Sequence, residues 1–389
     1  MTSVMDREHQ VVMQTYGRTP ITFVSGEGSW LVGETGERYL DCLTGLAVVS
    51  VGHSNPRITA AVTEQMNRLV HVSNLYYTEP MVELAEHLTR LSGLDRVFFA
   101  NCGATANEAA IKLARRWGQT MKGESCYEIV TLDDSFHGRS LATLAATGQP
   151  KKQETFQPLP PGFAQVAAND IDALAARVDD ATAAVMLETL QGEGGVVPLD
   201  VEYLAGVRQM CDDRNIALIV DDVQAGMGRT GTWFSWQQLG FEPDIATTAK
   251  ALANGLPIGA CMAISEKAKA FQPGDHATTF GGGPVVCAAA NAVIAEITER
   301  DLLTNCVERS DQFRTGLLEL DGVTSVRGRG LLLGAVLDSE RAGEVAAAAL
   351  EQKLIVNAVR PDTVRFAPPL TISPDEVDTA LTRFATALG

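Results

Sequence analysis

Residues 245–255 read Ile-Ala-Thr-Thr-Ala-Lys-Ala-Leu-Ala-Asn-Gly, and Lys250 follows a short run rich in Ile and Thr. Upstream, residues 216–221 read Ile-Ala-Leu-Ile-Val-Asp and end in Asp221. Both runs are typical of strands buried in a parallel sheet that helices cover on both faces. Polar residues that follow such strands meet at one edge of the sheet. We therefore expect an α/β fold that brings Lys250 and Asp221 close together.

The same alternation of strand-like and helical sequence runs through the middle of the chain. Strands are predicted at residues 96–100, 127–132, 183–188, 216–221, 244–248 and 259–264. The ends of the chain differ from the middle. Residues 28–40 are typical of a hairpin, and the sequence after about residue 300 predicts a helix, strands and a last helix. That helix should begin at Ser373-Pro374-Asp375-Glu376, which has the pattern of a capping box.

We therefore expect a large central domain and a smaller α+β domain that both ends of the chain build together. The predicted divisions are residues 1–55, which contribute to the small domain, residues 56–298, the large domain, and residues 299–389, the remainder of the small domain.

Lys250 and Asp221 together favour chemistry that uses pyridoxal 5′-phosphate. A lysine amine condenses with the aldehyde of this cofactor. A carboxylate facing the pyridine nitrogen keeps that nitrogen protonated, so that the ring accepts electrons from a substrate carbanion. Each residue alone is more often a surface charge or a helix cap, and the pair therefore needs support from the rest of the chain.

A candidate phosphate site lies in residues 98–108, Phe-Phe-Ala-Asn-Cys-Gly-Ala-Thr-Ala-Asn-Glu. The chain leaves a strand, turns at Gly103 and enters a helical pattern at Asn107. The backbone N–H groups of Gly103 and Ala104 would then face an anion at the positive end of the helix. An ordinary strand-to-helix turn would have the same pattern. Residues 226–231 fit the glycine pattern of dinucleotide sites, but no helix is predicted directly after them, so we expect no such site.

Composition argues against several classes of function. The chain has 31 Lys and Arg against 48 Asp and Glu, and its net charge of −17 disfavours nucleic acid and anionic membranes as partners. The seven cysteines form no Cys-x-x-Cys pair and the six histidines have no ligand-like spacing. We therefore expect no metal site and a reducing, cytoplasmic location. Neither a signal peptide nor a membrane helix is predicted.

Seven motifs occur in the order that one enzyme family has. They are Asn101–Glu108, Phe136–Arg139, Gln191–Glu193, Asp221–Gln224 with Gly226–Gly231, Lys250, Thr279–Gly282 and Arg365–Pro369. With them the chain resembles the class III aminotransferases from about Tyr16 to its C-terminus. Within that family, the acetylornithine aminotransferase subfamily is most similar in the sequences of three segments, Thr15–Arg18, His71–Pro80 and Arg327–Gly330. The resemblance implies the fold of the aspartate aminotransferase superfamily (pyridoxal-phosphate fold type I) and a homodimer with active sites at the subunit interface.

The resemblance also implies how the cofactor ring is held. Lys250 would form the Schiff base and then carry the proton between the substrate carbon and the cofactor. Asp221 would hold the proton of the pyridine nitrogen. Val223 and Phe136 would pack on the two faces of the ring, and Gln224 would reach its 3-hydroxyl.

The cofactor phosphate is implied to bind at Cys102, Gly103 and Ala104 of one subunit and at Thr279 of the other. Cys102 stands where the family commonly has a serine, and Ala104 and Thr105 also depart from its usual residues. Because a thiol is a weaker donor than a hydroxyl, backbone donors should carry more of the phosphate binding.

Substrate carboxylates are implied to bind two arginines, whose planar donor geometry suits them. Arg139 would hold the α-carboxylate of an ornithine-type donor or the distal carboxylate of glutamate. Arg365 would be masked by Glu193 until glutamate binds by its α-carboxylate, and Thr278 is placed at the substrate site by the same resemblance. Outside this family each arginine would more often be a structural ion pair.

The implied reaction converts N2-acetylornithine and 2-oxoglutarate into N-acetylglutamate 5-semialdehyde and glutamate, in arginine biosynthesis. A related aminotransferase acting on ornithine, succinylated donors, 4-aminobutyrate or another ω-amine would share the catalytic residues. A third possibility is a pyridoxal-phosphate-binding protein without turnover. The intact set of Lys250, Asp221, Arg139, Glu193 and Arg365 argues against it.

Overall fold

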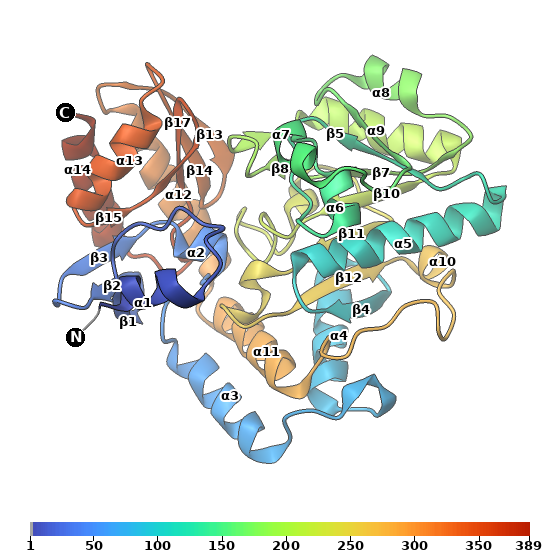
Figure 1. The fold of residues 1–389 in the computed structure, drawn as a ribbon, viewed down its shortest axis with the longest axis horizontal. Helices are drawn as coiled ribbons and strands as arrows, with labels where there is room; N and C mark the ends of the chain where they lie inside the picture. Colours follow the sequence, from blue (N-terminus) through green and yellow to red (C-terminus); the bar gives the residue numbers. More distant parts are fainter. Residues whose placement is uncertain (1–2) are drawn as a thin grey trace.

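A computed structural model describes residues 3–389 of the chain. In Figure 1 the first and last parts of the chain, blue and red, lie beside each other, and the middle of the chain forms the other half of the molecule. The largest element of the middle is a seven-stranded sheet with the order β4-β12-β11-β10-β7-β5-β6. Its strands are β4 (Arg96–Ala100), β5 (Glu128–Leu132), β6 (Phe163–Val166), β7 (Thr182–Leu187), β10 (Ala217–Asp221), β11 (Ile245–Thr248) and β12 (Gly259–Ala263).

The predicted α/β fold with a mostly parallel sheet is confirmed, and all six predicted strands are present with bounds within one residue. Strand β12 is the exception in direction, because it runs antiparallel to both β11 and β4. The four-residue strand β6 was not predicted, since it follows a proline-rich loop and is too short to show a periodic pattern.

Alternate residues of β10 supply the two hydrophobic layers on either side of the sheet. Ala217 and Ile219 pack in the layer formed with helix α5 (Gly103–Lys122). Leu218 and Val220 face the opposite layer, to which helix α9 (Val201–Arg214) contributes. Because successive side chains of a strand point to opposite faces, a fully apolar strand needs helices on both sides.

The other elements of the middle of the chain surround this sheet. They are α3 (Pro56–Arg68), η1 (Ser73–Leu75), α4 (Glu79–Ser92), α6 (Leu141–Ala146), α7 (Pro150–Gln153), η2 (Glu154–Phe156), α8 (Ile171–Arg177), the strand pair β8 (Leu190–Gln191) and β9 (Val197–Pro198), η3 (Ser235–Gln238), η4 (Lys250–Ala253), α10 (Ser265–Ala268) and α11 (Pro284–Glu299). Helix α11 packs against α3 and α4 (Figure 1). No helix opens directly after residues 226–231, as expected.

The ends of the chain form two four-stranded sheets, of which the first combines strands from both ends. The first has the order β1-β2-β3-β15 and contains the predicted hairpin, and the second has the order β13-β14-β17-β16. Their strands are β1 (Phe23–Glu27), β2 (Trp30–Gly33), β3 (Arg38–Asp41), β13 (Val323–Arg329), β14 (Leu332–Leu337), β15 (Leu354–Ile355), β16 (Asn357–Arg360) and β17 (Thr363–Phe366), with helices α2 (Thr44–Ala47), α12 (Leu302–Leu318), α13 (Ala342–Glu351) and α14 (Pro374–Leu388).

The last helix is capped as predicted, and its cap also ties the two ends together. Ser373 Oγ accepts a hydrogen bond from the Glu376 N–H at 3.2 Å, and Glu376 accepts one from the Ser373 N–H at 2.9 Å. The same carboxylate accepts the indole N–H of Trp30 at 2.7 Å. The predicted domain boundaries, between residues 55 and 56 and between residues 298 and 299, stay a prediction.

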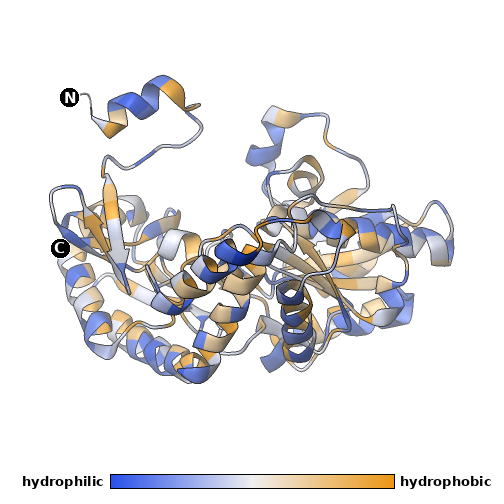
Figure 2. Ribbon diagram, turned by 90° about the horizontal axis from the view of Figure 1, so that it is seen from below, coloured by the Kyte–Doolittle hydropathy of each residue, from blue (hydrophilic) through white to orange (hydrophobic). Residues whose placement is uncertain are grey.

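The N-terminal helix α1 (Val4–Val11) stands away from the rest of the molecule in Figure 2 and has no buried residue. In the same view most residues of the central strands are hydrophobic. Across residues 3–389, each helix is too short or too polar to cross a membrane.

Candidate active site

The carboxyl ends of five strands and the start of β12 surround a cavity of about 380 Å³. Residues of the loops that follow β4, β5, β7, β10 and β11 line it: Asn101–Ala104, Phe136–Arg139, Glu188, Asp221 with Val223 and Gln224, and Ala249 with Lys250. Asp221 is the register partner of Thr247 across β10 and β11, so Lys250 comes three residues after that pair. The parallel sheet thus brings the predicted lysine and aspartate to one cavity.

Lys250 has an unusual backbone conformation and a lowered basicity. Its φ of +38° lies in the left-handed region, which costs a residue with a side chain of order 1–3 kcal/mol and persists only where neighbours hold it. Burial lowers the pKa of the Lys250 amine to about 8, although Glu193 and Asp221 oppose that shift. About a tenth of the amine is therefore neutral at pH 7 and able to act as a nucleophile or a base, far more than for an ordinary lysine.

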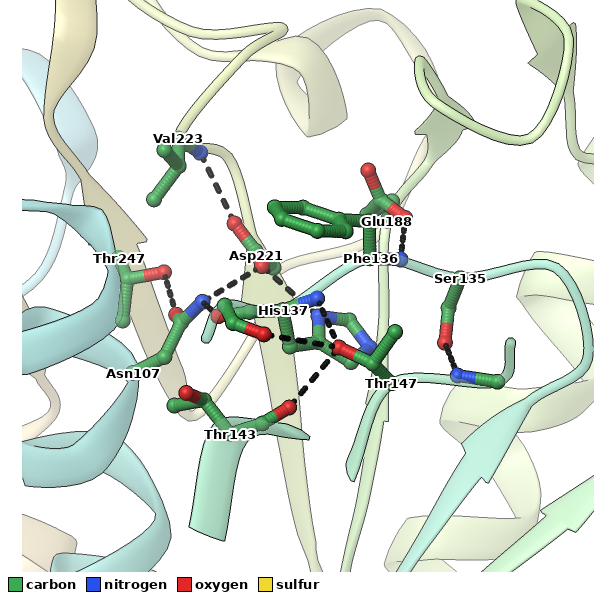
Figure 3. Close-up of polar contacts among 12 residues, drawn as sticks. Asn107, Ser135, Phe136, His137, Thr143, Thr147, Glu188, Asp221, Val223 and Thr247 are labelled. Carbon is green, nitrogen blue, oxygen red and sulfur yellow. Dashed lines mark hydrogen bonds and ion pairs between the residues drawn. The ribbon is translucent and has the colours of Figure 1, made fainter. Parts of the chain in front are cut away.

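Asp221 lies in a buried network of three donors (Figure 3). Its Oδ2 accepts a hydrogen bond from Asn107 Nδ2 at 2.7 Å and lies 2.8 Å from His137 Nδ1. Its Oδ1 accepts the backbone N–H of Val223 at 3.1 Å. Because an ionised carboxylate can only accept, His137 carries its proton on Nδ1 in this arrangement. The three contacts fix the direction of the carboxylate.

Asn107 connects this network to the sheet. Its amide also donates to the carbonyl of His137 at 2.7 Å, and its Oδ1 accepts the hydroxyl of Thr247 at 2.6 Å. Asn107 is 1% exposed, so all of these bonds lie away from bulk water. The sequence analysis gave Asn107 no role in the site. The only sequence signal was an amide on the otherwise apolar face of a helix.

The segment that carries Phe136 is anchored by a second buried acid. Glu188 accepts the backbone N–H of Phe136 at 3.0 Å. Burial, together with the negative charge of Asp221, raises the pKa of Glu188 well above its usual value. The raised pKa favours the neutral form of Glu188 more than water would, and that form does not repel Asp221. His137, the next residue of this segment, bonds to Asp221.

The predicted phosphate site lies at the first turn of α5. The helix begins at Gly103, four residues before the start that the sequence predicted, and Cys102 is its N-cap residue. A side chain could not replace the hydrogen of Gly103, because a Cβ there would lie 2.6 Å from Val223 Cγ1. The helix start therefore packs closely on the segment after Asp221 and presents backbone N–H groups that lack intrahelical acceptors.

Arg365 and Glu193 form the ion pair that the resemblance implied. Arg365 Nη1 lies 2.6 Å from Glu193 Oε1, and it also donates to Gln224 Oε1 at 3.3 Å. The Arg365 side chain is 1% exposed and that of Glu193 is 28% exposed. Burial raises the pKa of Glu193, but the charge and hydrogen bond of Arg365, with smaller contributions from Lys250 and Gln224, together lower it overall. In residues 3–389, Arg365 Nη2 is buried without an acceptor.

The remaining predicted residues lie in different places. Arg139 is exposed and lines the cavity, its guanidinium lies 5.7 Å from the centre of the Phe136 ring, and it has no ion pair within residues 3–389. Thr278 and Thr279 do not line the cavity. Thr279 is exposed, while the hydroxyl of Thr278 donates to Asn101 Oδ1 at 3.4 Å.

Comparison with known proteins assigns the fold and the cavity to a family. The sequence matches the family described as aminotransferase class-III over residues 11–388. The chain belongs to that family. A Gloeobacter violaceus protein named acetylornithine aminotransferase is 50% identical over 384 residues, which cover 97% of this chain and 96% of that protein.

Solved structures with a similar fold are also aminotransferases. The N-acetylornithine aminotransferase of Stenotrophomonas maltophilia has a TM-score of 0.86 at 34% identity and covers 99% of this chain and 98% of its own. The ornithine aminotransferase of Toxoplasma gondii has a TM-score of 0.94 at 30% identity and covers 100% of this chain and 95% of its own. The class-III aminotransferase is therefore a transaminase with the predicted fold, and its cofactor is pyridoxal 5′-phosphate.

The cavity residues of the class-III aminotransferase fit this cofactor. Lys250 supplies an amine of lowered pKa, and Asp221 supplies a carboxylate held in a fixed direction. Both residues line the same cavity. Phe136 and Val223 provide apolar surface, and the start of α5 provides donors for a phosphate. Among residues 3–389, no three His, Cys, Asp or Glu side chains are grouped so that they could hold a metal ion.

Proposed function

We propose that this class-III aminotransferase transfers the amino group of N2-acetylornithine to 2-oxoglutarate and yields N-acetylglutamate 5-semialdehyde and glutamate. The observation that carries the proposal is the pair of arginines, one open and one masked. Arg139 is exposed at the cavity, whereas Arg365 is paired with Glu193 at 2.6 Å. Relatives that are 45–50% identical and are named acetylornithine aminotransferases support acetylornithine as the donor.

We assign the following tasks to the residues around the cofactor. Bound pyridoxal phosphate supplies an electron sink for the substrate carbon. Lys250 would hold the cofactor by its aldehyde, and its amine would take the proton from the substrate carbon that bears the amino group. The Asp221 carboxylate, aligned by Asn107 and His137, keeps the proton on the pyridine nitrogen.

The other predicted residues have supporting tasks in the proposal. Phe136 and Val223 hold the two faces of the ring, and Gln224 reaches the 3-hydroxyl from its place beside Glu193. Cys102, Gly103 and Ala104 bind the phosphate at the helix start. Thr278, close to Asn101, contributes to the substrate site.

The two arginines explain how one cavity could accept two different substrates. While Glu193 neutralises Arg365, the α-carboxylate of the amino donor binds Arg139 alone. When 2-oxoglutarate or glutamate enters, its α-carboxylate takes the place of Glu193 on Arg365 and its distal carboxylate binds Arg139. Within residues 3–389 Arg365 Nη2 has no acceptor, so it remains available as the second donor of the two-pronged contact that a carboxylate prefers.

A donor panel tests the proposal. Purified protein with pyridoxal phosphate and 2-oxoglutarate is given N2-acetylornithine, ornithine, N-succinylornithine or 4-aminobutyrate, and glutamate formation is measured. We expect N2-acetylornithine to have the highest kcat/KM. A higher value for another donor would replace it as the substrate, and negligible rates with all four would refute amino transfer to 2-oxoglutarate.

We also propose that the enzyme works as a homodimer and is cytoplasmic. The segment before α4 and the loop before α11 pack together, since Asn74 donates to the carbonyls of Thr278 and Gly281 at 3.1 and 3.0 Å. They expose large apolar side chains, namely Leu75, Tyr76, Tyr77 and Phe280, which are 67–95% exposed. A second copy covering this surface would bring Thr279 to the other cavity. Sedimentation should give twice the mass of the chain. The seven free cysteines agree with a reducing compartment.

A further inference from the structure

Residues 41–53, which we call the strap, run between the two parts of the chain that carry Lys250 and Arg365. At its end near η4, the Val51 N–H donates to Asn254 Oδ1 at 2.9 Å, and Asn254 Nδ2 donates to the carbonyl of Gly52 at 2.9 Å. The buried Ser50 hydroxyl donates to the carbonyl of Ala251 at 3.3 Å. One bond therefore ties the strap to the four-residue turn that begins with Lys250, and two tie it to Asn254, the C-cap residue of that turn.

The strap is equally tied to the segment that follows Arg365. The Thr44 hydroxyl donates to the carbonyl of Ala367 at 2.7 Å, and the Ala367 N–H donates to the carbonyl of Cys42 at 2.7 Å. The Leu370 N–H donates to the carbonyl of Ser50 at 2.7 Å. One stretch of chain thus contacts both the base of the Lys250 turn and the loop two residues beyond Arg365.

The strap is held in a shape that an unconstrained chain would avoid. Four consecutive residues of the strap have positive φ values: Thr44 (51°), Gly45 (62°), Leu46 (71°) and Ala47 (63°). They form a left-handed turn, which L residues with side chains rarely adopt. Asp41 holds the entry to this turn, because its Oδ1 accepts the N–H groups of Leu43 at 3.0 Å and Thr44 at 2.7 Å. Such conformations persist where the surrounding structure fixes them, and they cluster at functional sites.

Asn254, the C-cap residue of η4, makes two hydrogen bonds to the strap. It ends the turn in the left-handed conformation, with φ +49° and ψ +41°, four residues after the left-handed Lys250. Its side-chain oxygen accepts the N–H of Val51 and its side-chain nitrogen donates to the carbonyl of Gly52, the next residue of the strap. Val48, in the middle of the strap, lines the cavity, so a displaced strap would also change the cavity wall.

We propose that Asn254 is a positioning residue, which through the strap fixes the Lys250 amine relative to the Arg365 guanidinium. The proposal rests on the proposed function, in which Arg365 holds the α-carboxylate of glutamate while Lys250 acts on the carbon bonded to that carboxylate. Asn254 does not line the cavity. It determines whether a substrate held by its carboxylate presents the correct carbon to Lys250. Errors of about 1 Å in such placement cost up to about a hundredfold in rate.

Asn254→Gly tests the proposal, with Asn215→Gly as its matched control. Glycine accepts the left-handed backbone, so only the side-chain bonds are lost at residue 254. Asn215 also ends a helix in the left-handed conformation, with φ +49° and ψ +55°, but it is exposed on the far end of α9. We expect Asn254→Gly to lower kcat at least tenfold, with KM for both substrates within about twofold because the arginines remain in place.

A second readout does not depend on turnover. The pH midpoint of the visible absorbance of the bound cofactor reports the surroundings of the Lys250 nitrogen, and it should move in Asn254→Gly but not in Asn215→Gly. If the two variants agree in kcat and in this midpoint, the positioning role is wrong. Should Asn254→Gly fail to fold, Ser50→Ala removes a single strap bond and must show the same two changes.

Lys250→Ala separates the two proposals. If it abolishes turnover while Asn254→Gly behaves like its control, only the positioning role fails. If Lys250→Ala retains turnover, the proposed function itself fails.

Discussion

Replacing Asn107 by leucine should weaken both the fold and the binding of the cofactor. The variant keeps the size of the side chain but removes a charge-assisted bond to Asp221 and a neutral bond to the His137 carbonyl, both 2.7 Å long. The bond to the Asp221 carboxylate is worth about 1.5–3 kcal/mol and the bond to the His137 carbonyl about 0.5–1.5 kcal/mol. The buried hydroxyl of Thr247 also loses its acceptor. We expect the free energy of unfolding to fall by about 3 kcal/mol.

The specific part of this prediction concerns Asp221. Without Asn107 its Oδ2 retains only His137, and a less well oriented carboxylate should raise the dissociation constant of pyridoxal phosphate at least tenfold, about 1.4 kcal/mol. Titration of the apoenzyme, followed by absorbance, measures this constant.

Asn291→Leu is the control, because Asn291 also lies on a helix and donates to a carbonyl and a carboxylate, those of Pro80 and Glu83, at 3.1 Å each and outside the cavity. It should destabilise the fold without affecting the cofactor. Equal dissociation constants for the two variants would refute the role of Asn107.

Three further predictions follow from the site. Glu193→Ala removes a charge-assisted bond worth about 1.5 kcal/mol from Arg365, so single-turnover kinetics should favour the glutamate half-reaction about tenfold over the other; equal effects on both halves, or the same result for exposed Glu351→Ala, would contradict the switch. Because burial lowers the pKa of Lys250 to about 8, cofactor uptake by the apoenzyme should rise with pH through a midpoint near 8, where more of the amine is neutral; a midpoint near 10 would contradict it. Thr279→Ala should weaken cofactor binding about tenfold, and mixed dimers with Lys250→Ala should regain one site of normal affinity, which would not occur if each subunit served itself.

Local sequence was sufficient for the elements with strong patterns. The apolar runs before Asp221 and Lys250 became β10 and β11 because strands buried on both faces need continuous apolar side chains. The capping box at Ser373 formed because its bonds join residues only three positions apart. Strand β6 was not predicted because it is short and directly follows a proline-rich loop, whose sequence indicates irregular structure.

The contacts that complete the site join residues far apart in the chain, and no local pattern encodes them. Asn107 meets Asp221, 114 positions away, only because α5 crosses the carboxyl edge of the sheet. The identity of Glu193 and Arg365 came from motif resemblance, but their separation of 2.6 Å depends on how the last strands pack against the central sheet.

The sequence by itself determined the α/β fold, the family and the candidate lysine and aspartate, because periodicity and motif order are properties of the chain. Tertiary structure alone decided the left-handed conformation of Lys250, its lowered pKa and its link through Asn254 to the strap. Burial and backbone strain arise only when distant segments surround a residue, so they become visible only in the folded molecule.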